Sequence, residues 1–376
     1  MGISLNVRGP IHDPGGYAEI TRSLTVQLHR LGVSISLQRH PWDFVRTALD
    51  EETQVLLDSM LSVVRNDGPV LHIGVPDDFR REPDCFSIGL TMLETDRICA
   101  HWVKICNQMD EIWVPSTFNQ QTFVSSGVEA DRLKVMPLGV DPQRFHPEAP
   151  PLPLSQKRGF AFLANFEWSL RKGYDLLIRA FVSEFSREEE VCLILKTYRN
   201  DPGFDPRGEA IQKEVDQLVE RTRKTGSPPI IIIGEILSMD SMPSLYTAAD
   251  CYILPTRGEG WNLPVMEAMA AGLPVITTGW SAPMDFLSEA NSYLIPIQGL
   301  EPLPPIERWK DRIYAGSCWA RPSLKETRRW MRHVFVNRQE AKGKGMRARA
   351  DVLTGFTWEI SAQRMLDRLR KIKMGL

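Results

Sequence analysis

The sequence predicts an α/β protein made of two domains, each built on a parallel β-sheet. Short apolar segments typical of buried strands alternate along most of the chain with segments whose apolar residues recur at helical spacing. Such alternation favours parallel strands that are covered by helices on both faces. Residues 142–153 are rich in proline and carry little apolar pattern, which is typical of a linker. We therefore expect a first domain over residues 1–150 and a second over residues 151–356.

The composition is that of an ordinary globular protein and excludes several classes of function. Of the 376 residues, 43% are hydrophobic and 24% are charged, and the net charge of −2 argues against a general nucleic-acid binder. The six cysteines form no Cys-x-x-Cys pair, so neither a zinc site nor a disulfide framework is expected. No signal-peptide pattern is visible, and no apolar run approaches the roughly 20 residues of a membrane span. We expect a cytoplasmic protein; a peripheral membrane contact and the oligomeric state stay open.

The first domain is expected to open with a strand, a glycine-containing turn and a helix. The strand covers residues 3–7, the helix covers residues 17–31, and Gly15 and Gly16 stand in the turn between them. Glycine lets the backbone approach a ligand closely, although a plain tight turn explains the pair equally well. Further strands are predicted over residues 33–37, 69–74, 86–93 and 111–114, and helices over residues 52–64, 98–109 and 116–126.

Two charged residues stand where predicted elements meet. Glu94 follows the strand 86–93, at the edge of an α/β sheet on which ligands bind, and both a sugar contact and a helix-capping carboxylate explain it. Lys172 precedes a helix of the second domain, where a lysine is badly placed for the helix dipole, so we expect it to bind an anion. The second domain is predicted to contain strands over residues 159–164, 191–196, 229–233, 251–254 and 292–295, helices over residues 206–224, 238–248, 324–336, 339–352 and 357–372, and a proline-rich loop over residues 299–305.

The most informative stretch runs from Pro255 to Ile276. It follows an apolar strand, passes through a loop with two glycines, and continues into a helix that begins at Pro264 and ends at Gly272. The N-terminus of a helix that follows a glycine loop suits an anion. The backbone N–H groups that would face a diphosphate there are those of Gly260, Trp261, Asn262 and Leu263.

Glu259 and Glu267 flank this helix N-terminus. Two carboxylates would repel a phosphate, but an ionised carboxylate accepts hydrogen bonds from two neighbouring hydroxyl groups. The stretch therefore favours a ligand with a diphosphate between hydroxyl-rich rings, which describes a nucleotide sugar. The alternative is that Glu259 is a solvated loop residue and Glu267 interacts with the helix dipole.

The run from Glu259 to Ile276 resembles the paired-glutamate signature of glycosyltransferase family 4, the group 1 glycosyltransferases. The match includes the spacing of the two glutamates, the proline before the helix and the Gly-Leu-Pro-Val-Ile sequence after it. Members of that family are retaining glycosyltransferases of the GT-B fold. The resemblance implies two Rossmann-like domains whose parallel sheets face each other across a cleft, with a C-terminal helix over residues 357–376 that crosses back to the first domain.

The resemblance also implies roles for individual residues. Glu267 would hold the nucleotide ribose, Glu259 would hold the sugar close to the reacting ring, and Gly15 and Gly16 would face the donor diphosphate. In the family an arginine and a lysine a few residues apart hold that diphosphate. Lys172 matches the lysine, but Phe166 and Glu167 stand where the arginine is expected, so the neighbouring Arg171 is the candidate replacement. Glu94 is a third candidate catalytic residue, beside Glu259 and Lys172.

From this resemblance we expect a retaining glycosyltransferase that uses a UDP- or GDP-linked sugar as its donor and needs no cofactor. The chain has no Asp-x-Asp motif, so we also expect a reaction that needs no metal ion. A glycan, a lipid-linked glycan and other acceptors stay open. Two alternatives are a nucleotide-sugar epimerase and a non-catalytic assembly subunit that keeps the fold. A dinucleotide-dependent oxidoreductase is disfavoured, because no Gly-x-Gly-x-x-Gly fingerprint follows the first strand.

Overall fold

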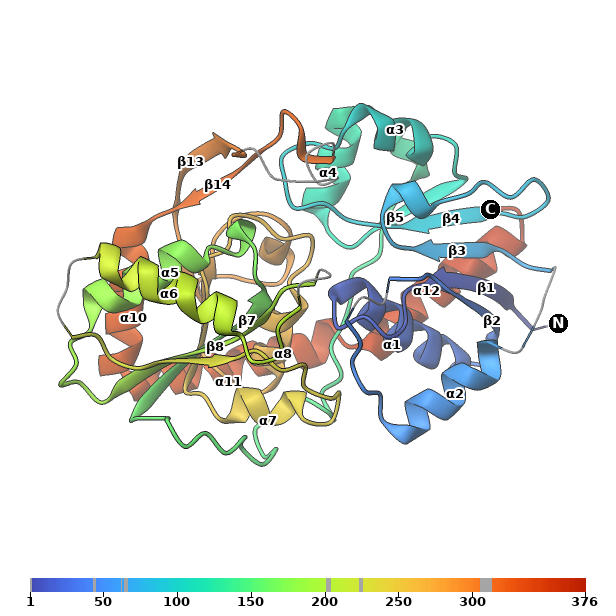
Figure 1. The fold of residues 1–376 in the computed structure, drawn as a ribbon. Coiled ribbons are helices and arrows are strands. Elements are labelled where there is room, and N and C mark those ends of the chain that lie inside the picture. Colours follow the sequence, from blue (N-terminus) through green and yellow to red (C-terminus); the bar gives the residue numbers. More distant parts are fainter. Residues whose placement is uncertain are drawn as a thin grey trace.

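The protein consists of two α/β domains that lie side by side (Figure 1). The computed structural model describes residues 2–42, 45–61, 63, 67–200, 204–222, 226–304 and 313–376. Each domain contains a six-stranded parallel sheet with helices packed around it, which confirms the predicted fold class. Within these ranges, no helix is both long and apolar enough to cross a membrane.

The first sheet has the strand order β2-β1-β3-β4-β5-β6. Its strands are β1 (Ser4–Gly9), β2 (Ser34–Arg39), β3 (Val70–Ile73), β4 (Ser87–Leu90), β5 (Glu111–Val114) and β6 (Leu133–Val135). The helices of this domain are α1 (Gly16–Arg30), α2 (Glu51–Leu61), α3 (Ala100–Cys106) and α4 (Thr117–Ser126), with short 3₁₀ turns η1 (Pro76–Asp78) and η2 (Ala130–Arg132). The Ser116 hydroxyl accepts a hydrogen bond from the Asn119 amide, which explains why α4 begins where the sequence predicts.

The second sheet has the order β12-β11-β10-β7-β8-β9. Its strands are β7 (Phe160–Glu167), β8 (Val191–Tyr198), β9 (Ile230–Ile233), β10 (Cys251–Leu254), β11 (Val275–Thr278) and β12 (Tyr293–Ile295). Its helices are α5 (Tyr174–Glu184), α6 (Glu209–Arg221), α7 (Met242–Thr247) and α8 (Leu263–Ala270), with 3₁₀ turns η3 (Leu170–Lys172) and η4 (Ala282–Asp285). The order of the strands reverses between β7 and β10, and ligands bind at such switch points in open α/β sheets.

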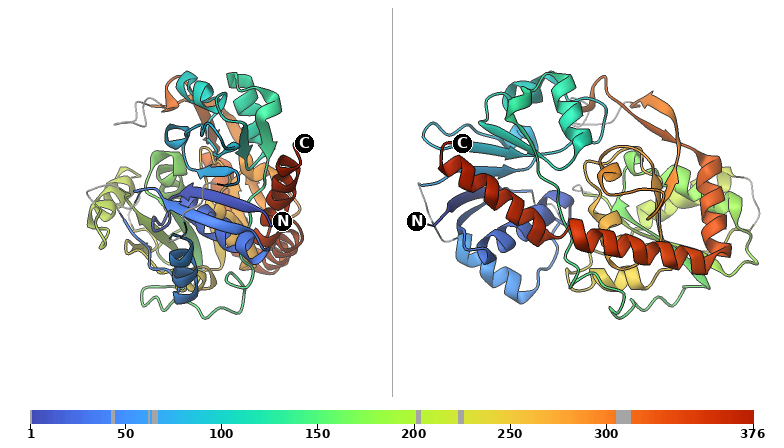
Figure 2. Two further views of the ribbon diagram at one scale, coloured as in Figure 1. Left: turned by 90° about the vertical axis from the view of Figure 1, so that its right-hand side faces the viewer. Right: turned by 180° about the vertical axis from the view of Figure 1, so that it is seen from behind.

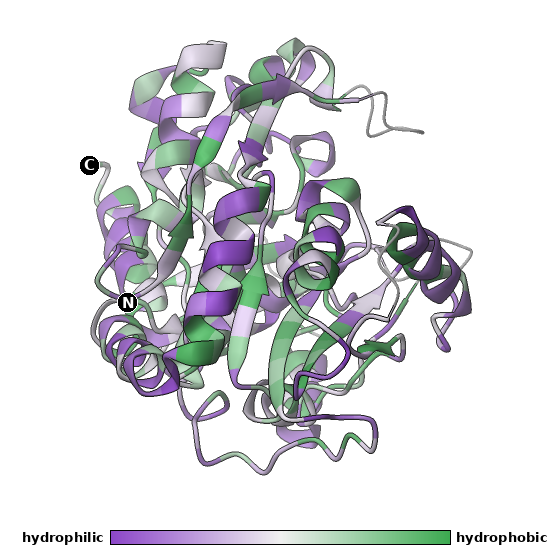
Figure 3. Ribbon diagram, turned by 90° about the vertical axis from the view of Figure 1, so that its left-hand side faces the viewer, coloured by the Kyte–Doolittle hydropathy of each residue, from purple (hydrophilic) through white to green (hydrophobic). Residues whose placement is uncertain are grey.

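The core of the second domain is formed by strands that are buried on both faces. All eight residues of β8 are buried, as expected for a parallel strand between two layers of helices. Figure 3 shows the hydrophobic strands behind helices whose outer faces are hydrophilic. This rigid parallel sheet holds the loops at its carboxyl edge in fixed positions.

Three consecutive helices end the chain: α10 (Leu324–Val336), α11 (Arg338–Gly355) and α12 (Trp358–Lys373). Helix α11 packs on α8 of the second domain, and α12 packs on α1 of the first (Figure 2). The link between α11 and α12 is tied to the first domain because the Val140 amide donates to the Phe356 carbonyl oxygen, 3.0 Å away. An ion pair between Arg368 and Glu111 fixes α12 further along its length.

The prediction of a loop over residues 299–305 is wrong for residues 299–302, which belong to a strand. Residues Ile297–Pro302 form strand β13, which pairs with β14 (Cys318–Pro322) in an antiparallel hairpin. The prolines suggested a loop, but Pro302 ends β13 and Pro322 ends β14, where the missing N–H groups do little harm. The hairpin reaches from the second domain toward α4 of the first (Figure 1).

Candidate active site

The candidate site is built on two loops that follow neighbouring strands at the switch point of the second sheet. Strands β7 and β10 pair directly, so the loop after β7, which carries Lys172, lies against the loop after β10, which carries Glu259. Gly173 has a left-handed φ of 72°, and a Cβ atom there would lie 2.1 Å from the Pro255 carbonyl oxygen. Only glycine therefore allows the two loops to approach this closely.

Glu259 is surrounded by the two cationic side chains of the first loop. Lys172 Nζ donates to both carboxylate oxygens of Glu259 at 2.8 Å, and Arg171 Nη1 lies 3.3 Å from Glu259 Oε2. Arg171 also donates to the Gly258 carbonyl oxygen at 2.8 Å. Adjacent side chains usually diverge, but these two are long enough to reach one carboxylate. The structure therefore brings Arg171 and Lys172 into the same site.

Burial and charge act in opposite directions on Glu259. Its side chain is 5% exposed, so it is not the solvated loop residue of the alternative interpretation. Burial alone would raise the pKa of Glu259, but Lys172 and Arg171 hold that pKa below its ordinary value. The carboxylate is therefore ionised at neutral pH and able to accept hydrogen bonds.

Glu94 joins this cluster from the first domain. Its Oε1 lies 3.2 Å from Arg171 Nη2, and its Oε2 accepts a hydrogen bond from the Tyr314 hydroxyl at 2.8 Å. The loops touch here, since a Cβ atom on Gly258 would lie 2.0 Å from the Glu94 carbonyl oxygen. Arg171 thus bridges carboxylates of the two domains.

A cavity of about 120 Å³ lies between the domains. Gly15 and Gly16, at the start of α1, line it on one side, and Leu263, Pro264 and Glu267 of α8 line it on the other. The Leu263 side chain is 3.9 Å from the position that a Cβ atom on Gly16 would take. The two predicted halves of the binding site therefore face each other across this cavity.

Glu267 is a partly buried carboxylate in the wall of the cavity. It accepts a hydrogen bond from the Tyr246 hydroxyl. Burial raises the pKa of Glu267 to about 7, and the nearby Glu19 carboxylate contributes in the same direction. Glu267 therefore changes its charge near neutral pH, unlike Glu259.

This titration predicts a pH-dependent effect of Glu267→Gln on stability. A raised pKa stabilises the folded protein when Glu267 is protonated, and this contribution is lost as the pH rises from the unfolded value to about 7. Glutamine imitates the neutral form, so at pH 8 the variant is expected to exceed the wild type in free energy of unfolding by up to about 3 kcal/mol. The gap should shrink as the pH falls toward 5.

Urea denaturation at pH 5 and pH 8 measures this difference. The exposed Glu220 on α6 offers a control, because Glu220→Gln should change stability little at either pH. The same gap between Glu267→Gln and the wild type at both pH values would contradict a Glu267 carboxylate that titrates near neutrality.

The loop before α8 presents unpaired backbone donors. In the part of the chain that the structure describes, the N–H groups of Gly260, Trp261 and Asn262 find no protein acceptor. Asn262 has a left-handed φ of 81°, and its side-chain oxygen accepts from the Val265 amide at 3.4 Å, which caps α8. The Trp261 ring is buried, with its centroid 5.1 Å from that of Phe286. Trp261 therefore offers its backbone amide to the site and its side chain to the core.

Sequence reasoning missed Lys196, Tyr246 and Tyr314. Lys196 lines the cavity at the end of β8, and burial lowers its pKa to about 8. A lysine at the carboxyl end of an otherwise apolar strand was the available signal. The sequence contains no such signal for Tyr246 or Tyr314. Each contacts a glutamate, Glu267 or Glu94, only in the folded chain.

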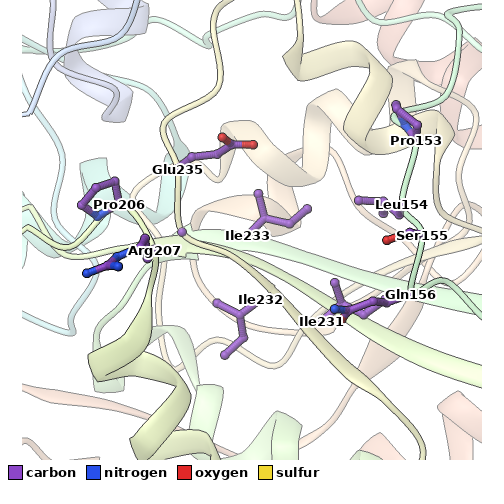
Figure 4. A pocket seen from close by; sticks show the side chains of 11 residues that line it. Pro153, Leu154, Ser155, Gln156, Pro206, Arg207, Ile231, Ile232, Ile233 and Glu235 are labelled. Carbon is purple, nitrogen blue, oxygen red and sulfur yellow. The ribbon is translucent and has the colours of Figure 1, made fainter.

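A second cavity, of about 320 Å³, lies at the edge strand β9. The linker residues Pro153–Gln156 line it on one side, and Pro206, Arg207 and Glu235 line it on the other (Figure 4). Glu235 lines this second cavity, and the next residue, Ile236, lines the cavity between the domains. The second cavity contains none of the residues predicted for the site.

Two parallel Rossmann-like sheets, with a polar site at the carboxyl edges that face each other, define the GT-B class of fold. Anabaena HepE in complex with UDP and glucose has a TM-score of 0.69 and 14% identity, with 98% of this chain and 99% of that chain covered. Sucrose-phosphate synthase from Thermosynechococcus elongatus also has a TM-score of 0.69, with 15% identity and both chains covered completely.

The comparisons with families and relatives agree with this class. Residues 157–301 match the family model of group 1 glycosyl transferases. The chain is 31% identical over 207 residues to mannosylfructose-phosphate synthase of Agrobacterium fabrum, covering 54% of this chain and 44% of that protein. It is 22% identical over 300 residues to D-inositol 3-phosphate glycosyltransferase of Nocardia farcinica, covering 76% of this chain and 55% of that protein. The chain thus spans about half the length of these curated relatives.

Residues 157–301 thus form a group 1 glycosyl transferase domain within a chain of the GT-B fold, and the family prediction made from the Glu259–Ile276 run is confirmed for this domain.

Proposed function

We propose that the protein is a retaining glycosyltransferase that moves a hexosyl group from a UDP- or GDP-linked sugar to an acceptor hydroxyl. The observation that carries the proposal is the convergence of Arg171 and Lys172 on Glu259, beside the open amides of the loop before α8. Two cations next to free N–H groups fit a diphosphate, and ionised carboxylates fit the hydroxyl groups on either side of it.

The cavity between the domains would hold the nucleoside part of the donor. Glu267 would accept hydrogen bonds from the ribose hydroxyls, and Gly15 and Gly16 leave room for the backbone to approach the diphosphate. Because the Glu267 carboxylate loses its proton near pH 7, nucleotide affinity should rise with pH through neutrality.

Arg171 and Lys172 would stabilise the negative charge that develops on the leaving diphosphate. In this reaction the bond between the sugar C1 and the diphosphate oxygen breaks, and the acceptor oxygen bonds to C1 from the same face. The acceptor proton passes to the departing phosphate, so no separate base is required. Glu259 would orient the sugar hydroxyls, and Glu94 would contact the sugar or the acceptor. Since two side-chain cations serve the leaving group, we propose that the reaction does not depend on a metal ion.

The names of the relatives support a hexosyl donor without fixing the acceptor. Several are mannosyltransferases, three of which are described as dependent on GDP-mannose, and the HepE structures contain UDP or UDP-glucose. A glycan, a lipid-linked glycan and a small phosphorylated polyol are acceptors of the kinds named among them. A cytoplasmic location remains part of this proposal.

Melting temperatures with different ligands separate this proposal from an oxidoreductase and from a non-catalytic assembly subunit. UDP, GDP, UDP-glucose, GDP-mannose and NAD would each be added at 1 mM, a concentration of about 100 times a dissociation constant of 10 μM, which would stabilise the protein by roughly 2.7 kcal/mol. A transferase should respond to one nucleoside diphosphate and to its sugar. A response to NAD alone would contradict the proposal, and no response to any nucleotide would favour an assembly subunit.

A further inference from the structure

The hairpin formed by β13 and β14 ties the first domain to the signature loop of the second. We call β13, β14 and the described residues 313–317 before β14 the hairpin strap. On the side of the first domain, Asp96 makes two backbone contacts: its Oδ1 accepts from the Cys318 amide at 2.6 Å, and its own amide donates to the Cys318 carbonyl oxygen at 3.1 Å. The hydroxyl of Ser317 donates to the Arg97 carbonyl oxygen at 3.3 Å.

The strap also enters the hydrophobic core of the first domain. Ile313 is 5% exposed and belongs to the cluster of buried side chains that contains Leu93 and Ile98. Tyr314 packs against the same cluster. The segment before β14 is therefore anchored by apolar burial as well as by hydrogen bonds.

On the side of the second domain, the strap contacts the loop that carries Glu259. The Ala320 amide donates to the Arg257 carbonyl oxygen at 2.8 Å, and the Arg257 guanidinium lies 5.5 Å from the centre of the Trp319 ring. Arg257 is itself fixed by a bidentate ion pair with Asp175 at 2.8 and 2.9 Å. The strap thus connects residues 94–98 with the loop that begins at Pro255.

Tyr314 places a hydroxyl group at one end of a continuous chain of polar contacts. The hydroxyl donates to Glu94, Glu94 pairs with Arg171, Arg171 pairs with Glu259, and Glu259 pairs with Lys172. Burial raises the pKa of Tyr314 well above 10, so its hydroxyl keeps its proton and remains a donor. The hydrogen bond leaves the other oxygen of Glu94 facing Arg171.

We propose that Tyr314 is a positioning residue for glycosyl transfer: it fixes the Glu94 carboxylate from the strap and thereby orients Arg171 toward the leaving diphosphate. This inference rests on the proposed function. A Glu94 carboxylate without this hydrogen bond can rotate, and Arg171 then loses one of the two carboxylates that hold its guanidinium in place. The ring of Tyr314 supplies packing, whereas its hydroxyl supplies the orientation.

The variant Tyr314→Phe tests the inference, because it removes one oxygen and keeps the ring in its cluster. With UDP-glucose or GDP-mannose, whichever the wild type hydrolyses, we expect kcat to fall about 10-fold and KM to change less than twofold. In a Glu94→Ala background, which lacks the acceptor, adding Tyr314→Phe should change kcat less than twofold, because the two residues act through one contact. Tyr293→Phe is the matched control: its hydroxyl donates to Glu340 at 3.0 Å, outside the site, and its loss should leave kcat unchanged.

Three results would overturn the inference. A wild-type kcat in Tyr314→Phe would exclude a positioning role while leaving the proposed function intact. A full 10-fold effect of Tyr314→Phe in the Glu94→Ala background would show that the tyrosine hydroxyl does not act through Glu94. No turnover of either nucleotide sugar by the wild type would remove the proposed function and this inference together.

Discussion

Replacing Glu259 with glutamine is expected to reduce nucleotide-sugar turnover by about 100- to 1,000-fold, the range measured for losing one polar contact to a transition state. Affinity for the free nucleoside diphosphate should at least be maintained. In the structure, Glu259 occupies both Lys172 and Arg171, so it competes with a diphosphate for these cations. Glutamine keeps the shape of the side chain, removes the competing charge and replaces one acceptor oxygen with an NH₂ donor, which would weaken the proposed contact to the sugar hydroxyls.

Calorimetric titration with UDP and GDP, beside initial rates of sugar release, separates the two effects. Losing a buried carboxylate leaves the charge of Lys172 unpaired, so the variant should melt at a lower temperature than the wild type. Binding of the diphosphate should then raise the melting temperature of the variant more than that of the wild type. If turnover and diphosphate affinity instead fell by the same factor, Glu259 would be a structural support for the loop and not a sugar contact.

Replacing Lys172 with methionine is expected to weaken both diphosphate binding and turnover. Lys172 is the more buried of the two cations, and it makes both of the 2.8 Å contacts to Glu259. Methionine keeps the apolar stem but removes the charge, so we expect kcat to fall by about 100-fold or more. The dissociation constant of the nucleoside diphosphate should rise about 10-fold or more, as for the loss of a charged hydrogen bond.

A matched control for this charge removal lies in the same domain. Lys344 has its ammonium group 4.2 Å from the centre of the Tyr293 ring, outside the site, so Lys344→Met should leave both constants unchanged. An undiminished diphosphate affinity in Lys172→Met would show that Arg171 and the loop amides are sufficient, and that Lys172 only neutralises Glu259.

The sequence predicts the architecture well because the relevant signals are local. The alternation of apolar strands and amphipathic helices predicts the bounds of most elements to within a few residues. Helix α1, for example, is expected over residues 17–31 and found over Gly16–Arg30. The signature loop is equally local, since Glu259, the helix start and Glu267 lie within nine consecutive residues. Such features survive without knowledge of tertiary contacts.

The remaining features depend on residues that are distant in the sequence. Strand β13 forms only because β14 supplies its partner, and Tyr314 reaches Glu94 from 220 positions away. The convergence of Arg171 and Lys172 depends on a carboxylate 87 residues later in the chain. Local patterns contain no information about such contacts, so the charged network that links the two domains could not be predicted.

The most direct test of the account is the hydrolysis of UDP- and GDP-linked sugars without an acceptor, comparing the wild type with Glu259→Ala. We expect slow release of one nucleoside diphosphate by the wild type, which would identify the donor, and a loss of this release in the variant. A folded wild-type protein that neither hydrolyses nor binds any nucleotide sugar would contradict this expectation.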